Sequence, residues 1–158
     1  MRSKLPFGQA RLVEEDMTDL VADTARTSMR GPIKTTGILH FTIGVRDHMA
    51  AAEFYSELLG CRHLRSNERY SFMQCGTDYF VLAKIPHHVN PNNPGEDAHH
   101  HAFLVDADEF DRAMKVLQES GIALVKYSDQ DHRSFPGRHA YFHDPDGNCI
   151  EIVTLYQT

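Results

Sequence analysis

Three residues with metal-binding side chains, His40, His100 and Glu151, stand out in this chain of 158 residues. Glu151 is a single carboxylate in an otherwise apolar predicted strand over residues 149–153, where a charge is costly to bury unless a cation or another partner offsets it. Two imidazoles and one carboxylate that converge form a 2-His-1-carboxylate site, which suits Fe(II) or Mn(II) and leaves positions open for substrate and dioxygen. The spacing alone equally allows two of the three to be hydrogen-bonded core residues.

A strand followed by an amphipathic helix, the arrangement that must position these side chains, is predicted twice. Residues 38–45 alternate as a strand does, and Asp47 can cap a helix that ends at Gly60. The pattern restarts with a strand over residues 100–105 and a helix that Asp108 can cap. Each unit continues with three further strands, near residues 61–66, 69–75 and 79–85 in the first, and near residues 122–127 and on both sides of the turn at 144–147 in the second.

The two units are copies of one strand-helix-three-strand pattern, and overlaying them places His40 on His100 and Val81 on Glu151. One unit alone would expose one face of its sheet, so two units must pair to bury a core. The predicted fold class is therefore α+β with two βαβββ modules. Because strands alternate their faces, His40, His100 and Glu151 are predicted to point away from the helix-packing residues.

The chain is predicted to consist of an N-terminal extension and one domain. Residues 1–36 form the extension, in which apolar residues recur at the spacing of one short helix; a partly disordered leader is the alternative. Residues 37–156 form the domain, with module one at 37–86 and module two at 98–156. A loop rich in proline and asparagine joins the modules.

Composition restricts the partners and the compartment. The net charge of -6 disfavours nucleic acid, because phosphate binding needs a basic patch. No apolar stretch is long enough to cross a membrane, and the first residues lack the apolar segment of a secretory signal. Cys61, Cys75 and Cys149 lack metal-binding spacing and are expected to be reduced thiols. We therefore expect a cytoplasmic protein that binds neither nucleic acid nor membrane.

Three stretches of the sequence resemble the vicinal oxygen chelate superfamily, which includes glyoxalase I, fosfomycin-resistance proteins, bleomycin-binding proteins and extradiol ring-cleaving dioxygenases. They are residues 40–60, which end in Phe-Tyr-x-x-x-Leu-Gly, residues 100–105, which read His-His-Ala-Phe-x-Val, and residues 141–151, which read Tyr-Phe-x-Asp-Pro-Asp-Gly-Asn-x-x-Glu. The resemblance covers residues 38–155. It implies that the modules pair into a curved, barrel-like mixed sheet with helices outside, around a metal site, in a homodimer.

The ligand pattern is similar to two branches of that superfamily. Glyoxalase I has a carboxylate ligand on the last strand of each module, whereas Val81 occupies that place in module one. A set of two histidines and one carboxylate is similar to the extradiol dioxygenases and to the fosfomycin-resistance proteins. The catechol dioxygenase pattern also has a His nine residues before a Tyr and a Glu ten residues after it, as His132, Tyr141 and Glu151 stand here.

The resemblance to extradiol dioxygenases implies that His40, His100 and Glu151 hold Fe(II), and that a catecholic substrate chelates the metal through two vicinal oxygens. It also implies that His132 and Tyr141 donate hydrogen bonds to the substrate. The leading interpretation is therefore a small non-haem extradiol dioxygenase.

An imidazole in the loop before module two is the predicted acid-base group, because either His87 or His88 could accept a proton from a catechol near neutral pH. Two other functions stay open. One is a glyoxalase-like lyase or epimerase, or a fosfomycin-resistance enzyme, with Mn(II) or Zn(II) in place of Fe(II). The other is a metal-free protein that binds a small molecule, as bleomycin-resistance proteins do. The sequence does not distinguish a site within one chain from a site shared across a dimer.

Overall fold

The computed structural model describes residue 32, residue 35, residues 37–130 and residues 135–156. It confirms the predicted α+β class and the strand-helix-three-strand pattern of both modules. The predicted helix of the N-terminal extension and the candidate donor His132 lie outside the described residues. No helix within the described ranges is both long and apolar enough to cross a membrane.

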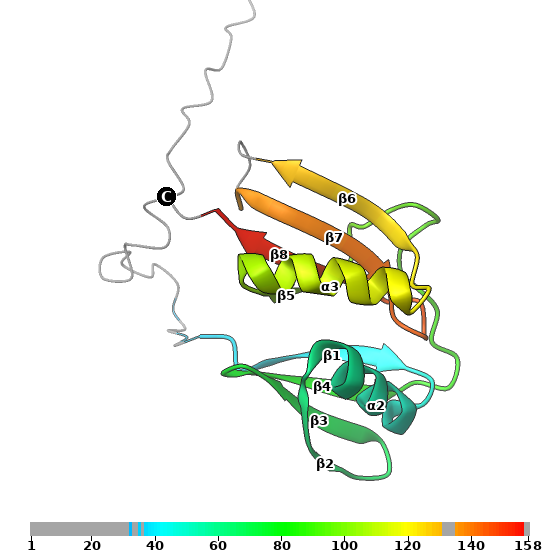
Figure 1. Cartoon of the computed structure of the whole chain (residues 1–158). Helices are drawn as coiled ribbons and strands as arrows, with labels where there is room; N and C mark the ends of the chain where they lie inside the picture. Colours follow the sequence, from blue (N-terminus) through cyan, green and yellow to red (C-terminus); the bar gives the residue numbers. More distant parts are fainter. Residues whose placement is uncertain (1–31, 33–34, 36, 131–134, 157–158) are drawn as a thin grey trace, which may run out of the picture. The chain divides into compact units, whose positions relative to one another are not determined.

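Module one contains strand β1 (His40–Val45), helix α2 (His48–Leu59) and strands β2 (Arg62–Ser66), β3 (Tyr70–Cys75) and β4 (Asp78–Lys84). The strands form one sheet in the order β1-β4-β3-β2 (Figure 1). Strand β1 runs parallel to β4, and the other pairs are antiparallel. The parallel pair requires a crossover connection, which helix α2 begins.

The predicted ends of α2 are confirmed. The Asp47 carboxylate accepts hydrogen bonds from the backbone N–H groups of Met49 and Ala50, which satisfies donors that a helix start leaves unpaired. These two hydrogen bonds lower the pKa of Asp47. Gly60 ends the helix at a φ of 65°, in the left-handed region that a residue without a Cβ adopts at least cost.

Module two contains strand β5 (His100–Leu104), helix α3 (Ala107–Glu119) and strands β6 (Leu124–Gln130), β7 (Gly137–His143) and β8 (Cys149–Leu155). Its sheet has the order β5-β8-β7-β6, with β5 parallel to β8. The topology therefore repeats that of module one, strand for strand.

The start of α3 differs from the expectation. Asp108 was predicted as its cap, but the helix begins at Ala107 with Asp106 in the cap position. Asp108 therefore lies in the first turn, where its charge complements the helix dipole. Strand β6 also ends three residues later than the strand predicted near residues 122–127. That extension is explained by pairing with β7, which the local pattern of a single strand does not encode.

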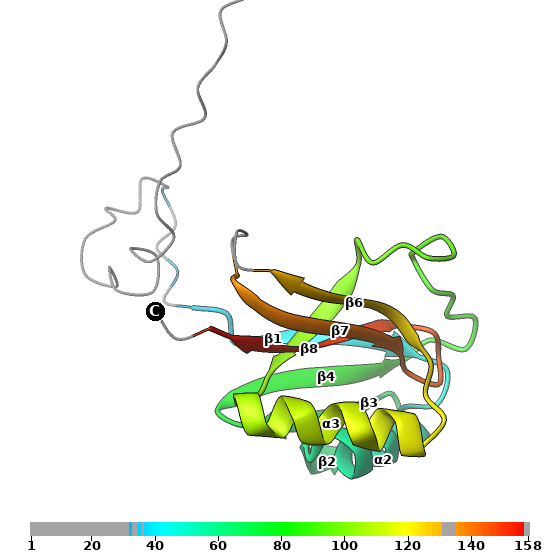
Figure 2. The ribbon, with the colours of Figure 1, turned by 45° about the horizontal axis from the view of Figure 1, so that its top comes forward.

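Each helix lies against one face of its own sheet and leaves the other face without a helix (Figures 1 and 2). The helix-facing side chains of the two modules merge into one core. The ring centroid of Phe80 lies 5.6 Å from that of Phe41 and 5.3 Å from that of Tyr55 within module one. It also lies 5.7 Å from the ring centroid of Phe103 in module two. Aromatic packing therefore joins the modules on their helix sides.

The turn between β7 and β8 adds hydrogen bonds between the modules. The Tyr55 hydroxyl of α2 donates to the Asp144 carboxylate at 2.9 Å, and the Asn148 side-chain amide donates to the Gly44 carbonyl at 3.0 Å. Asp144 and Asn148 are both buried. Their polar groups are satisfied by module one, so the turn depends on both modules.

The predicted curved arrangement of two paired modules is confirmed, and its strands form two four-stranded mixed sheets. Strands β1 and β5 each stand at the edge of their own four-stranded sheet, and no ladder joins the two sheets among the described strands. The sheets are curved and open (Figure 2).

Candidate metal centre

The face of the β5–β8 sheet that carries no helix holds His100 and Glu151. The parallel ladder pairs Ala102 with Glu151 and His100 with Cys149, so His100 and Glu151 project from neighbouring strands on one face. His100 Nε2 and Glu151 Oε2 are 3.0 Å apart. Glu151 is only 4% exposed, so its charge is largely removed from water and needs a proton or a cation beside it.

The backbone fixes the orientation of His100. Its Nδ1–H donates to the carbonyl oxygen of Asp97 at 2.6 Å, which leaves Nε2 as the nitrogen that faces Glu151. Histidines that bind metals commonly use their other ring nitrogen in this way, because the hydrogen bond sets the tautomer and the ring direction. His100 is therefore held in the orientation that a metal ligand needs.

A second imidazole, His139, contacts the same carboxylate. Its Nδ1 lies 2.5 Å from Glu151 Oε1, and its Nε2–H donates to the carbonyl oxygen of Phe135 at 2.9 Å. We did not predict His139 as a site residue from the sequence. The alternation of β7 was the available signal, because His139 and Tyr141 must share a face and Tyr141 pairs directly with Glu151.

Tyr141 lies beside both candidate ligands. Its ring makes an edge contact with the His100 ring at a centroid distance of 5.4 Å. Burial, together with the neighbouring Glu151 carboxylate, raises the pKa of the Tyr141 hydroxyl. The phenol therefore stays protonated near neutral pH and can donate a hydrogen bond.

Lys126 of β6 brings a positive charge to this face. Its Nζ lies 2.7 Å from the Asp97 carboxylate and 5.4 Å from the ring centroid of Tyr141. The hydrogen bond from Lys126 lowers the pKa of Asp97. Asp97 therefore holds Lys126 through its side chain and His100 through its backbone carbonyl.

His40 stands in the other sheet, at the exposed start of β1. Across the parts of the chain that the structure describes, no three His, Cys, Asp or Glu side chains gather closely enough to hold a metal ion. The structure thus brings two of the three predicted ligands, His100 and Glu151, into contact, and leaves His40 in module one.

The two candidate acid-base histidines have different surroundings. His88 donates from Nε2 to the Asn148 side-chain oxygen at 2.7 Å and packs over Gly44, where a Cβ would come within 2.8 Å of its Nδ1. These contacts join the modules. His87 is exposed in the loop after β4. Neither contact of His88 involves the three predicted ligands.

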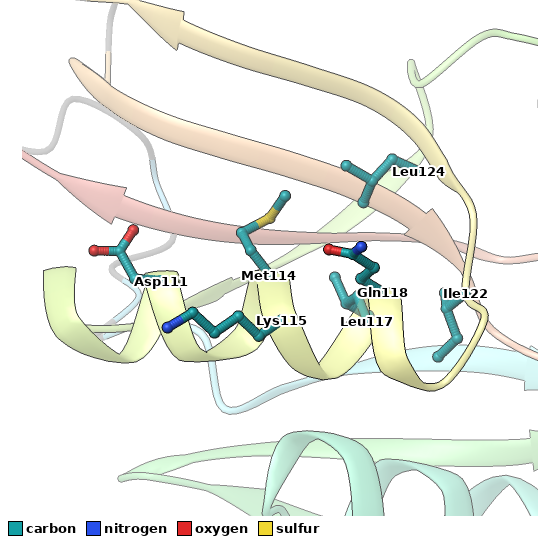
Figure 3. A pocket seen from close by; sticks show the side chains of 7 residues that line it. All are labelled: Asp111, Met114, Lys115, Leu117, Gln118, Ile122 and Leu124. Carbon is teal, nitrogen blue, oxygen red and sulfur yellow. The ribbon is translucent and has the colours of Figure 1, made fainter.

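Described residues on the helix side of the sheets line cavities, of which two bear on the site. One, of about 620 Å³, lies between α3 and β6 and is lined by Met114, Leu117 and Leu124 among others (Figure 3). The other, of about 460 Å³, lies between the C-terminal end of α2 and helix α3. Neither includes His100 or Glu151, so the candidate centre is an open sheet face and not one of these cavities.

The donor chemistry of this face fits a divalent metal ion. A neutral imidazole nitrogen and a carboxylate oxygen are ligands that Fe(II), Mn(II) and Zn(II) all accept. The second nitrogen of His100 is already bonded to a backbone carbonyl, which is the support that ligating histidines usually have. A third protein ligand has to come from outside this pair.

Residues 37–152 match the family model described as the Glyoxalase/Bleomycin resistance protein/Dioxygenase superfamily. The chain belongs to this superfamily. The predicted resemblance to the vicinal oxygen chelate proteins is therefore confirmed at the level of the superfamily, although not for the extradiol branch.

Curated and solved relatives belong to several branches. Metallothiol transferase FosB from Staphylococcus epidermidis (strain ATCC 12228 / FDA PCI 1200) is 25% identical over 122 residues, which are 77% of this chain and 84% of the relative. A solved glyoxalase/dioxygenase from Nostoc punctiforme is 27% identical with a TM-score of 0.66, over 84% of this chain and all of its own.

A more distant solved structure is similar in fold alone. The fosfomycin resistance protein FosX from Listeria monocytogenes, solved with Mn(II) and a sulfate ion, is 18% identical with a TM-score of 0.63, over 78% of this chain and 93% of its own.

Proposed function

We propose that this superfamily member is a metal-dependent enzyme that modifies a small molecule, by transferring a thiol to an electrophile of the fosfomycin type. The observation that carries the proposal is the buried Glu151 carboxylate with His100 aimed at it on an open sheet face. The relative FosB is a metallothiol transferase, which supports thiol transfer. The FosX structure holds Mn(II), which favours Mn(II) over the Fe(II) expected from the sequence.

We assign His100 and Glu151 of one copy and His40 of a second copy as the metal ligands, in a homodimer. Leu104 of edge strand β5 is 70% exposed, and Ile38 and Leu39, which precede edge strand β1, are 88% and 75% exposed. Apolar side chains along open sheet edges favour association with a second chain. In a dimer that covers these edges, His40 of the second copy supplies the third ligand, which one chain alone does not bring to His100 and Glu151.

The metal would act as a Lewis acid that polarises an oxygen of the bound substrate. Tyr141, protonated near neutral pH, donates a hydrogen bond to that substrate, and Lys126 offers a positive charge to an anionic group such as a phosphonate. In the proposed reaction a sulfur–carbon bond forms and a carbon–oxygen bond of the substrate breaks. The oxygen keeps the electron pair of the broken bond and takes the proton that the thiol releases.

The test uses the full chain loaded with Mn(II), fosfomycin, and cysteine or glutathione, with ³¹P NMR of the phosphonate as the measurement. We expect a new phosphonate signal that requires protein, metal and thiol together. Glu151→Gln should lower its rate of formation by at least about 100-fold, since even partners of metal ligands matter that much. Glu119→Gln, at the exposed end of α3, is the matched control. No new signal with any thiol contradicts thiol transfer.

An extradiol dioxygenase is the second candidate, and the position of Tyr141 favours it, because the catechol pattern requires a tyrosine beside the carboxylate ligand. Iron-loaded protein should then consume oxygen with a panel of catechols. The metal-free binding protein is the third possibility. It predicts that the wild-type protein purifies without stoichiometric metal, which elemental analysis measures directly.

The cytoplasm is the compartment we propose. Cys61, Cys75 and Cys149 are free thiols in the structure, as a reducing compartment maintains them.

A further inference from the structure

We propose that His139 is a positioning residue that holds one oxygen of Glu151 so that the other faces the metal. This inference rests on the metal centre of the proposed function. The two carboxylate oxygens have different partners: Oε1 lies 2.5 Å from His139 Nδ1, and Oε2 lies 3.0 Å from His100 Nε2. The carboxylate plane is therefore fixed from both ends.

The contact between His139 and Glu151 contains a hydrogen. Nδ1 and a carboxylate oxygen are both acceptors without one, and the Phe135 carbonyl already engages the hydrogen on Nε2. His139 thus engages Oε1 and leaves Oε2, which faces His100, as the oxygen for the metal.

The surroundings of His139 keep its ring in place. Its side chain is only 12% exposed, compared with 34% for His100. Strand β7 also lies very close to β8 two residues earlier, because a Cβ on Gly137 would come within 2.1 Å of the Thr154 carbonyl oxygen. This close approach fixes the backbone from which Phe135 and His139 reach each other.

The same geometry distinguishes a residue that positions Glu151 from a residue that binds the metal. His139 approaches the oxygen that His100 does not, and the described residues include no group of three donors placed for one metal ion. The more exposed His100 leaves its side of the carboxylate open to an entering ion. Partners that hydrogen-bond to a ligating carboxylate typically change metal affinity by about 10- to 100-fold.

The test compares Mn(II) affinity, by isothermal titration calorimetry, for wild type, His139→Ala, His139→Asn and the control His143→Ala. His143 is an exposed histidine at the end of the same strand. We expect His139→Ala to bind about 10- to 100-fold more weakly. His139→Asn should stay close to wild type, because its side-chain N–H can replace that of Nδ1. Affinity unchanged in His139→Ala overturns the inference.

A spectroscopic measurement distinguishes the two roles. In Cu(II)-loaded protein, the nitrogen superhyperfine pattern of the EPR spectrum counts coordinated imidazoles. The count should be the same in wild type and His139→Ala. A loss of one nitrogen would show that His139 is itself a ligand and would overturn the positioning role.

A metal-free measurement keeps this inference separate from the proposed function. If the wild type binds no metal, the proposed function fails, whereas the contact itself can still be tested in a double-mutant cycle by urea unfolding. His139→Ala and Glu151→Ala should be strongly non-additive, because each removes the partner of the other. Additive effects would show that His139 does not hold Glu151.

Discussion

The two modules share one topology but present different chemistry on the sheet faces that carry no helix. Their strand registers align position for position, and the equivalent pairs are His40 and His100, Tyr70 and His139, Phe72 and Tyr141, and Val81 and Glu151. Only the first pair keeps its residue type. Apart from the shared histidine, the same backbone positions therefore support aromatic and apolar side chains in one copy and His139, Tyr141 and Glu151 in the other.

The turns between the last two strands differ as strongly. In module one the turn between β3 and β4 is exposed at Thr77 and Asp78. In module two Asp144 is 5% exposed and accepts hydrogen bonds from Tyr55, from Asn148 and from the backbone N–H of Asp146. One turn only connects two strands, whereas the other also connects two modules.

These differences show that the repeat supplies positions and not functions. A carboxylate can be kept at position 151 because two imidazoles face it, and nothing comparable surrounds Val81, whose cross-strand neighbours are Thr42 and Phe72. Exchanging single features between the modules tests how far the comparison holds.

The largest effect is expected when module two is given the residue of module one, in Glu151→Val. Metal content should fall from about one ion per site to none, because the anionic ligand is lost. The protein should also become less stable, because removing one partner of a buried pair leaves His100 and His139 without their shared acceptor. Elemental analysis and urea unfolding measure the two outcomes. Metal retained in Glu151→Val, with Glu53→Val as the exposed control, would contradict the assignment of Glu151.

The reverse exchange, Val81→Glu, should destabilise the protein by about 3 kcal/mol, because a buried carboxylate without a partner is costly. Val81 is 8% exposed, whereas Val89 is 77% exposed and provides the control Val89→Glu. Urea denaturation gives the free energy of unfolding. Equal values for the two variants would mean that module one tolerates the charge as module two does.

Removing the turn carboxylates should separate the two turns. Asp144→Ala leaves several buried donors unpaired and should cost about 3 kcal/mol of the free energy of unfolding. Asp78→Ala, at the exposed turn of module one, should change it by no more than about 0.5 kcal/mol. Similar losses in chemical denaturation would argue against the turn as a connection between modules.

The smallest effect concerns thiol reactivity. A hydrogen bond from Cys61 lowers the pKa of Cys75 in module one, whereas burial raises the pKa of Cys149 in module two to about 11. At pH 7 Cys75 therefore has the larger thiolate fraction and should react with iodoacetamide at least about 10-fold faster. Raising the pH should increase labelling of Cys149 more than that of Cys75. Mass spectrometry after short exposures follows both, and equal rates at pH 7 would refute the assignment.

Much of the fold was predictable because it follows from local patterns. Asp47 and Gly60 have the chemistry of helix ends, and the alternation in residues 38–45 and 149–153 places the apolar side chains on one face. The repeat then predicted the same strand-helix-three-strand pattern for both modules, which the structure confirms. How the modules meet was not predictable, because Tyr55 and Asp144 are far apart in the sequence and either could have faced solvent.

The candidate site was partly predictable for the same reason. His100 and Glu151 were placed on one face by alternation, and the structure puts them in contact. His139 was not predicted as a site residue, because its strand also contains His143. Composition does not show which of these two histidines faces a carboxylate. Lys126 and Asp97 reach the site through side-chain contacts between a strand and a loop, which no sequence period encodes.

The segment after β4 gives the two module copies unequal surroundings, which affects how their sequences can diverge. Ile85 and His88 fill the space over Gly44, where a Cβ would lie 2.8 Å from each side chain. The equivalent residue of module two, Leu104, is 70% exposed. A tandem duplication makes two copies of a fold but only one connector, so the copies have unequal surroundings from the first generation onward. In this chain the connector crowds the first copy at that position, where a larger residue would have to displace the side chains of Ile85 and His88, and leaves the second copy free to vary.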